Sequence, residues 1–211
     1  MARDVGAAQA EDRGRDETRE ADEHRGEKGL GHDEGPIMAP SPFVVEWLER
    51  LAREPAPRGG PRRALDVAAG RGRHTIAIAR AGFLAFAVDM RLDALRAAAA
   101  AAAAARVGVH CWCADLTQHP LPPARFDLVV VARYLRRDLF AALQRTVAPG
   151  GVVVYETFTT AQRALGVGPK SPDHLLEPGE LRARFDGWSV LAYEETREPE
   201  AVARLAARRR G

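Results

Sequence analysis

The stretch that decides the fold is "ALDVAAGRGRHTIAIARAGFLAFAVD", residues 64–89. An apolar run leads into a glycine-rich turn, a segment with helical spacing follows, and a second apolar run ends at Asp89. This order predicts a strand over 64–68, a helix over 72–81 and a strand over 84–88. Such a strand–helix–strand unit is the building block of a parallel sheet.

The same alternation continues along the chain. Further strands are predicted over 107–112, 126–132 and 152–158, and further helices over 91–105 and 136–146, with "PGG" at 149–151 as a break. After a short helix, "GELRARF", two strands at 188–195 and 201–209 are close enough to form an antiparallel hairpin. The pattern therefore predicts an α/β fold, a doubly wound and mostly parallel seven-stranded sheet that ends in an antiparallel hairpin.

The two ends of the chain differ in composition. The composition of residues 1–38 predicts a disordered charged tail, because a segment with few apolar and many charged side chains cannot bury enough surface to fold. Residues 39–211 predict a single folded domain. Its first helix follows Pro42, with Val44, Trp47, Leu48 and Leu51 on one face.

The composition excludes several classes of protein. No run approaches the roughly 18 apolar residues of a membrane helix, and the N-terminus lacks the apolar centre of a signal peptide, so we expect a cytoplasmic protein without a membrane partner. The two cysteines, Cys111 and Cys113, form no disulfide framework. They lie two apart on a strand, where we expect buried thiols on one face of the sheet rather than a metal site.

The glycine-rich turn predicts a ligand with a nucleoside. Gly70 and Gly72 allow close approach of the backbone, and the amides at the start of the next helix attract an anionic group. Asp89 ends the second strand about twenty residues further on, where a carboxylate accepts hydrogen bonds from ribose hydroxyls. Asp89 could instead cap the following helix.

At this point the residues carry a resemblance. "LDVAAGRGR" resembles the first motif of class I S-adenosylmethionine-dependent methyltransferases, with Asp66 as its acid and Ala68, Gly70 and Gly72 at its turn positions, the first of which departs from glycine. "CADL", "FDLVVVARYL" and "VAPGGVVVYETF" resemble the motifs of the third, fourth and fifth strands. Within the family, "GRGRHTIAIA", "GELRARFDGWSVLAYEE" and "AVARLAARR" are most similar to the tellurite-resistance branch.

The resemblance implies an enzyme that binds S-adenosyl-L-methionine and methylates a small molecule, as a monomer or homodimer. It implies that Asp115 contacts the adenine amino group and that Met90 packs on the adenine. The full set of expected cofactor residues is Asp66, Ala68, Gly70, Arg71, Gly72, Asp89, Met90, Asp115, Leu116 and Ala132. An RNA or protein methyltransferase and a non-catalytic S-adenosylmethionine-binding protein remain alternatives, although no cluster of basic and aromatic residues indicates nucleic acid.

The acceptor site is expected where the fourth and fifth strands end. Its candidates are Arg133, Tyr134, Glu156 and Thr157, and none of them is identified as a general base. Arg71 and His74, at the turn, either reach the carboxylate of the cofactor or are solvated. The resemblance also implies a long loop with a catalytic histidine and arginine in tellurite enzymes. Here that loop is "TREPE", 196–200, so we expect tellurite to be a poor substrate.

Overall fold

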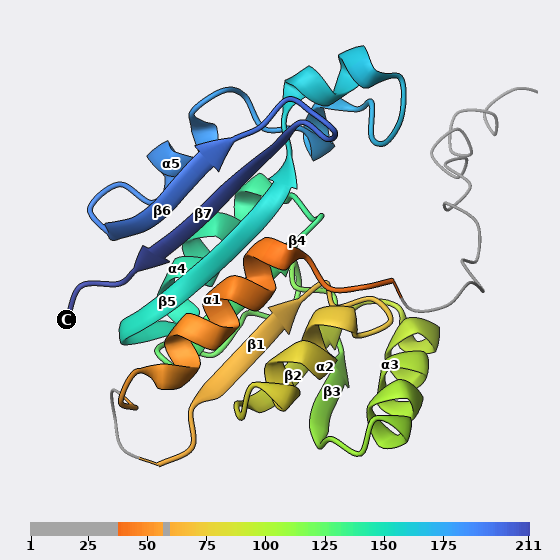
Figure 1. Ribbon diagram of the computed structural model, residues 1–211, viewed down its shortest axis with the longest axis vertical. Helices are drawn as coiled ribbons and strands as arrows, with labels where there is room; N and C mark the ends of the chain where they lie inside the picture. Colours follow the sequence, from red (N-terminus) through yellow and green to blue (C-terminus); the bar gives the residue numbers. More distant parts are fainter. Residues whose placement is uncertain (1–37, 57–59) are drawn as a thin grey trace, which may run out of the picture. The chain divides into compact units, whose positions relative to one another are not determined.

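A computed structural model describes residues 38–56 and 60–211. Its seven strands are β1 (Arg63–Val67), β2 (Leu84–Asp89), β3 (Val109–Cys113), β4 (Phe126–Ala132), β5 (Val147–Phe158), β6 (Ser189–Glu195) and β7 (Val202–Arg208). They form one sheet in the order β3-β2-β1-β4-β5-β7-β6 (Figure 1). Strands β1 to β5 pair in parallel, and β7 lies antiparallel between β5 and β6. The predicted fold class is confirmed.

Helices cover both faces of the sheet. The α-helices are α1 (Pro42–Arg53), α2 (Arg73–Arg80), α3 (Leu92–Ala104), α4 (Phe140–Thr146) and α5 (Glu180–Arg184), and the 3-10 helices are η1 (Arg137–Leu139), η2 (Thr160–Leu165) and η3 (Pro172–His174). In Figure 1, α1, α2 and α3 lie in front of the sheet and α4 lies behind it. Side chains of α4 and α5 share one apolar cluster, and those of α1 and α2 share another.

The apolar patterns explain this layering. In β4, Leu128 and Val130 join the cluster of α1, whereas Val129 and Val131 join the cluster of α4. A strand covered on both faces has to be apolar at every position, which is why residues 126–132 show no alternation. The predicted face of α1 is buried at all four positions, from Val44 to Leu51.

Two local predictions are wrong. "PGG" does not separate helix from strand, because β5 begins at Val147 and runs through Gly151. A Cβ at Gly151 would lie 2.9 Å from the Ala148 carbonyl oxygen, so the close backbone approach accounts for this glycine. Cys111 and Cys113 are exposed rather than buried, because β3 is an edge strand.

Some predictions concern residues beyond this description. The expected disordered tail, 1–38, lies outside the described residues except for Met38.

Over 38–56 and 60–211, no group of three or more His, Cys, Asp or Glu side chains could hold a metal ion. Within the same ranges, no helix combines the length and the apolar character needed to span a membrane.

Candidate cofactor and acceptor site

The glycine-rich loop lies at the carboxyl end of β1. Ala68 and Gly70 both have φ of 54°, and Gly72 has φ of 81°. A Cβ on Gly70 would meet no atom within 4 Å, so the loop presents bare backbone to open space there. A Cβ on Gly72 would come 2.7 Å from the Ala98 Cβ, so this glycine is needed where α2 packs on α3. The two glycines therefore have different roles, which their spacing alone did not separate.

Asp89 ties the loop to the end of β2. Its Oδ2 accepts a hydrogen bond from the Gly70 amide at 2.8 Å, and its Oδ1 accepts one from the Arg91 amide at 2.9 Å. Helix α3 begins at Leu92 without a side-chain cap, so Asp89 is not its N-cap. The half-buried carboxylate is left beside the exposed side of the loop, with lone pairs for further donors.

Asp66 lies beneath the loop rather than at its surface. It is 1% exposed, and the Thr75 hydroxyl donates to its Oδ2 at 2.6 Å. Burial raises the pKa of Asp66 to about 7, against the opposing effect of the Thr75 hydrogen bond. The acid of the first motif thus joins β1 to the first turn of α2.

Asp115 organises the loop after β3. Its carboxylate accepts hydrogen bonds from the Thr117 amide at 2.9 Å, the Thr117 hydroxyl at 2.8 Å and the Gln118 amide nitrogen at 3.3 Å. The bonds from Thr117 lower the pKa of Asp115, so it is a carboxylate at neutral pH. Met90 directly follows β2 and is 69% exposed, at the same carboxyl-terminal side of the sheet as Asp115.

Arg133 follows β4 in an unusual conformation. Its φ of 58° is in the left-handed region, and its amide donates to the Glu156 carbonyl at 2.8 Å. Two of its guanidinium nitrogens donate to the carboxylate of Glu200, at 2.8 and 2.5 Å. The hydrogen bonds from Arg133 lower the pKa of Glu200. The short loop between β6 and β7 thus neutralises the arginine that the sequence suggested for an anionic acceptor.

Glu156 is the centre of a buried polar network. It is 1% exposed, and its Oε2 accepts hydrogen bonds from the Ser41 hydroxyl at 3.0 Å and from Arg204 Nε at 2.5 Å. Arg133 Nε lies 3.8 Å from its Oε1. A buried carboxylate requires such partners, because its desolvation is otherwise uncompensated. Glu156 and the buried Thr157 next to it are therefore structural residues near the carboxyl end of β5.

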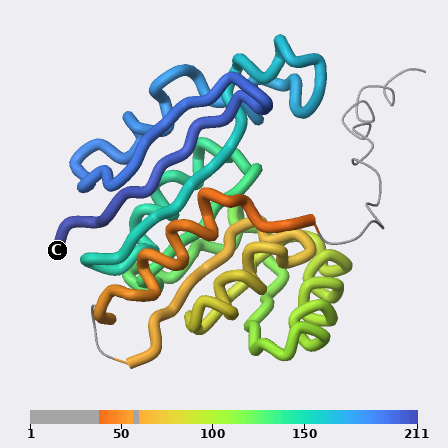
Figure 2. The backbone as a smooth tube through the Cα atoms, viewed as in Figure 1, coloured from red at the N-terminus to blue at the C-terminus, as the bar shows by residue number. Residues whose placement is uncertain are grey.

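His74, in the first turn of α2, is bonded to Ser41 at the start of α1. These two helices lie next to each other (Figure 2). Its Nε2 accepts a hydrogen bond from the Ser41 amide at 3.0 Å, so the ring is neutral with its proton on Nδ1. Burial, followed by the charges of Arg73 and Arg133, lowers the pKa of His74 to about 3. A neutral histidine supplies no charge to a carboxylate, and at 4% exposure His74 is not the solvated group of the other alternative either, so both expectations for this residue are wrong.

Four residues of the site were missed from the sequence. They are Ser41, Arg73, Glu200 and Arg204. Arg73 is half-buried at the start of α2, and its Nη1 lies 3.4 Å from the Ala39 carbonyl oxygen. The "SP" pair at 41–42 signals a helix start, but nothing local indicates a partner more than a hundred residues away.

Comparisons with known proteins agree with this geometry. Residues 64–151 match the family described as "Methyltransferase domain". No curated protein matches the chain.

Solved structures with the same fold share little sequence with the chain. An S-adenosylmethionine-dependent methyltransferase from Mesorhizobium loti is 21% identical, with a TM-score of 0.60 over 78% of this chain and 98% of that one. TehB from Haemophilus influenzae is 16% identical, with a TM-score of 0.63 over 79% and 61%. Magnesium protoporphyrin IX methyltransferase from Synechocystis PCC 6803, with bound SAH, is 18% identical, with a TM-score of 0.59 over 79% and 80%.

Proposed function

We propose that this chain, an S-adenosylmethionine-dependent methyltransferase by its domain match and class I fold, methylates a small-molecule acceptor. The observation that carries the proposal is the pairing of charges at the acceptor edge, by which we mean the carboxyl ends of β4 and β5 and the segments packed on them. There, Arg133 and Arg204 are paired with Glu200 and Glu156. Ser41 closes this edge, because its amide donates to His74 of α2 and its hydroxyl donates to Glu156 of β5. Short segments held by direct bonds suit a small acceptor better than a macromolecule.

The described residues fit S-adenosylmethionine. Gly70 offers open space over bare backbone, and the carboxylate of Asp89, at the end of β2, bonds to its amide. Asp115 follows β3, the strand that pairs with β2. We infer that Asp89 accepts the ribose hydroxyls and Asp115 the adenine amino group, with Met90 and Leu116 against the ring. Ala68, Arg71 and Ala132 complete the proposed set, and Asp66 and Gly72 act by holding α2 in place. When bound, the cofactor supplies a methyl group on a positively charged sulfur.

Among the residues that the structure describes, the acceptor edge offers no ready general base. Burial raises the pKa of Tyr134, so its hydroxyl keeps its proton at neutral pH. The Nε2 of His74 is already an acceptor for the Ser41 amide, and Glu156 is paired with Arg204. Alignment and exclusion of water are then the main contributions of the protein. These features favour an acceptor that is nucleophilic without losing a proton, such as a thiolate.

A nucleic-acid acceptor is disfavoured by the pairing of the arginines. Binding to phosphates depends on cations that are available to them. Beside the site, Arg136 is paired with Asp138 and Arg137 with Glu180, in addition to the two pairs above. The similarity to TehB shows a shared fold and does not identify an acceptor. A tellurite acceptor is therefore not part of this proposal.

The test is transfer of a labelled methyl group from S-adenosylmethionine to a cell extract. We expect label in the small-molecule fraction, and roughly 5- to 50-fold less of it when Asp89→Ala replaces the parent chain at a cofactor concentration near the parent's Kd. Label in RNA or protein would overturn the small-molecule acceptor. Cofactor binding without any transfer would instead support a non-catalytic binding protein.

A further inference from the structure

The connection from β3 to β4 crosses the sheet without a helix. Residues 114–125 run from the edge strand past β2 and β1 to β4, on the face that carries α4. The described part of this connection contains turns and extended segments only. Crossovers between parallel strands more often contain a helix, which covers the strands they pass. Here the aromatic side chains on this face of β2 and β3 are covered by a loop alone.

A cavity of about 320 Å³ lies between this loop and the sheet. Its walls are mostly apolar and aromatic: Phe86, Trp112, Pro120, Leu121, Pro122 and Phe126. Arg63, His119 and Arg125 line the remainder. This size and this combination of apolar walls with a few polar groups are typical of small-molecule sites.

Within residues 38–56 and 60–211, Arg63 carries the buried side-chain polar atom that has no hydrogen-bond partner. Its guanidinium lies over the Phe86 ring, with its Cζ 4.8 Å from the centroid. Its Nε is buried, and no residue of the described chain accepts its hydrogen bond. Buried polar atoms in proteins nearly always have a partner, so an unpaired donor in a cavity wall indicates a missing acceptor.

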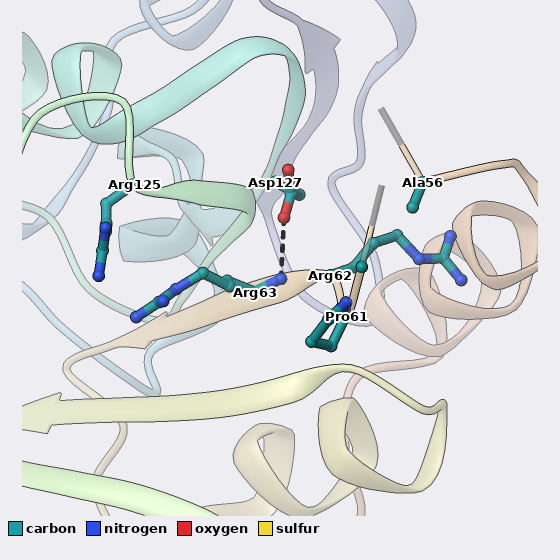
Figure 3. Close-up of a pocket in the computed structure, with 7 residues that line it drawn as sticks. Ala56, Pro61, Arg62, Arg63, Arg125 and Asp127 are labelled. Atoms are coloured by element: carbon teal, nitrogen blue, oxygen red, sulfur yellow. Dashed lines mark hydrogen bonds between the residues drawn. The ribbon is translucent and has the colours of Figure 1, made fainter. Parts of the chain in front are cut away.

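Arg63 and Arg125 also border a second cavity, of about 230 Å³, at the start of β1. Figure 3 shows both side chains on the same side of β1, while the Arg63 amide donates to Asp127 Oδ2 at 2.8 Å. The backbone of Arg63 is thus held firmly, and its side chain is directed by the strand toward the aromatic face. Asp127 borders the second cavity but not the first, so among the described residues the carboxylate-free lining with two arginines, Arg63 and Arg125, belongs to the cavity of about 320 Å³.

We propose that the cavity of 320 Å³ binds a small planar aromatic carboxylate. The ring would pack among Trp112, Phe86 and Phe126, and the carboxylate would accept the hydrogen bond of Arg63 Nε. Guanidinium groups pair with carboxylates through two parallel hydrogen bonds, which a neutral amide does not reproduce. The charge and the aromatic walls together select this class over aliphatic anions and over neutral aromatics.

This site is separate from the methyl-transfer site. None of the residues that line it belongs to the proposed cofactor set. Arg63 begins β1, whereas the glycine-rich loop follows its other end, about 16 Å away at roughly 3.3 Å per residue. The proposal therefore does not depend on the proposed function.

The test uses 1-naphthoate and its neutral counterpart, 1-naphthamide, titrated into the full chain by calorimetry. We expect 1-naphthoate to bind at least tenfold more tightly than 1-naphthamide, with or without saturating S-adenosylmethionine. Arg63→Gln should weaken 1-naphthoate at least tenfold and remove the preference for the acid. Arg80→Gln, which changes an exposed arginine of α2, should leave both affinities unchanged. Circular dichroism and cofactor affinity establish that each variant is folded.

Several outcomes would overturn the proposal. Equal affinities for 1-naphthoate and 1-naphthamide, or no binding of 1-naphthoate, would show that the carboxylate is not recognised. This comparison uses the parent chain alone, so it does not depend on whether a variant folds. Displacement of 1-naphthoate by S-adenosylmethionine would assign the binding to the cofactor site. Self-association that Trp112→Glu abolishes would show that a second copy of the chain covers this face.

Discussion

Asp89 is expected to support both the loop and the cofactor, so Asp89→Ala should affect stability and affinity together. The substitution removes the hydrogen bonds to the Gly70 and Arg91 amides, at 2.8 and 2.9 Å. At a net ~0.5–1.5 kcal/mol each, the free energy of unfolding should fall by about 1–3 kcal/mol. For a chain of this size, that corresponds to a decrease in Tm of roughly 2–12 °C.

The loss of affinity follows from the bonds to the ribose. Hydrogen bonds to a charged group contribute about 1.5–3 kcal/mol, so the Kd for S-adenosylmethionine should rise roughly 10- to 100-fold. Asp93→Ala is the matched control, because this exposed carboxylate lies four residues after Asp89 and also pairs with Arg91. The measurements are calorimetric titration and thermal unfolding. An Asp89→Ala variant that binds S-adenosylmethionine as the parent does would refute the assignment, and so would an equal loss in Asp93→Ala.

Three further predictions concern the loop, the buried acid and the acceptor. Gly72→Ala should lower the free energy of unfolding by about 2–4 kcal/mol in denaturant, through overpacking and a left-handed φ. Gly70→Ala carries only the left-handed penalty, of about 1–2 kcal/mol, and should in addition lower cofactor affinity. Because the folded pKa of Asp66 is about 7, above its unfolded value of 3.8, its contribution to stability is complete below pH 3.8 and is lost as the pH rises through about 7. Asp66→Asn should flatten the stability curve across that range, and a curve unchanged from the parent's would contradict the raised pKa. Turnover of S-adenosylmethionine should be slower with tellurite as acceptor than with thiols, because Arg133 is already bonded to Glu200. Fast turnover with tellurite and none with thiols would contradict this.

Much of the fold follows from patterns that involve near neighbours. The spacing of apolar residues distinguishes strand from helix because each side chain's direction depends on its own backbone period. The continuous apolar run in 126–132 indicates a central strand, and parallel strands bring their carboxyl ends to one edge. That is why Asp89, Asp115 and Arg133 could be assigned to one edge before any coordinates were known. The antiparallel hairpin was indicated by the short connection between the last two strands.

Other features depend on which strands become neighbours, and no local pattern contains that information. Ser41 meets Glu156 across 115 positions of sequence, and Arg133 meets Glu200 across 67. These contacts convert apparent substrate-binding charges into internal pairs. Likewise, Cys111 and Cys113 have the spacing of buried residues, yet they are exposed because their strand lies at the edge of the sheet. Local sequence specifies the conformation of each segment, whereas burial and pairing of charges depend on the packing of segments that are distant in the chain.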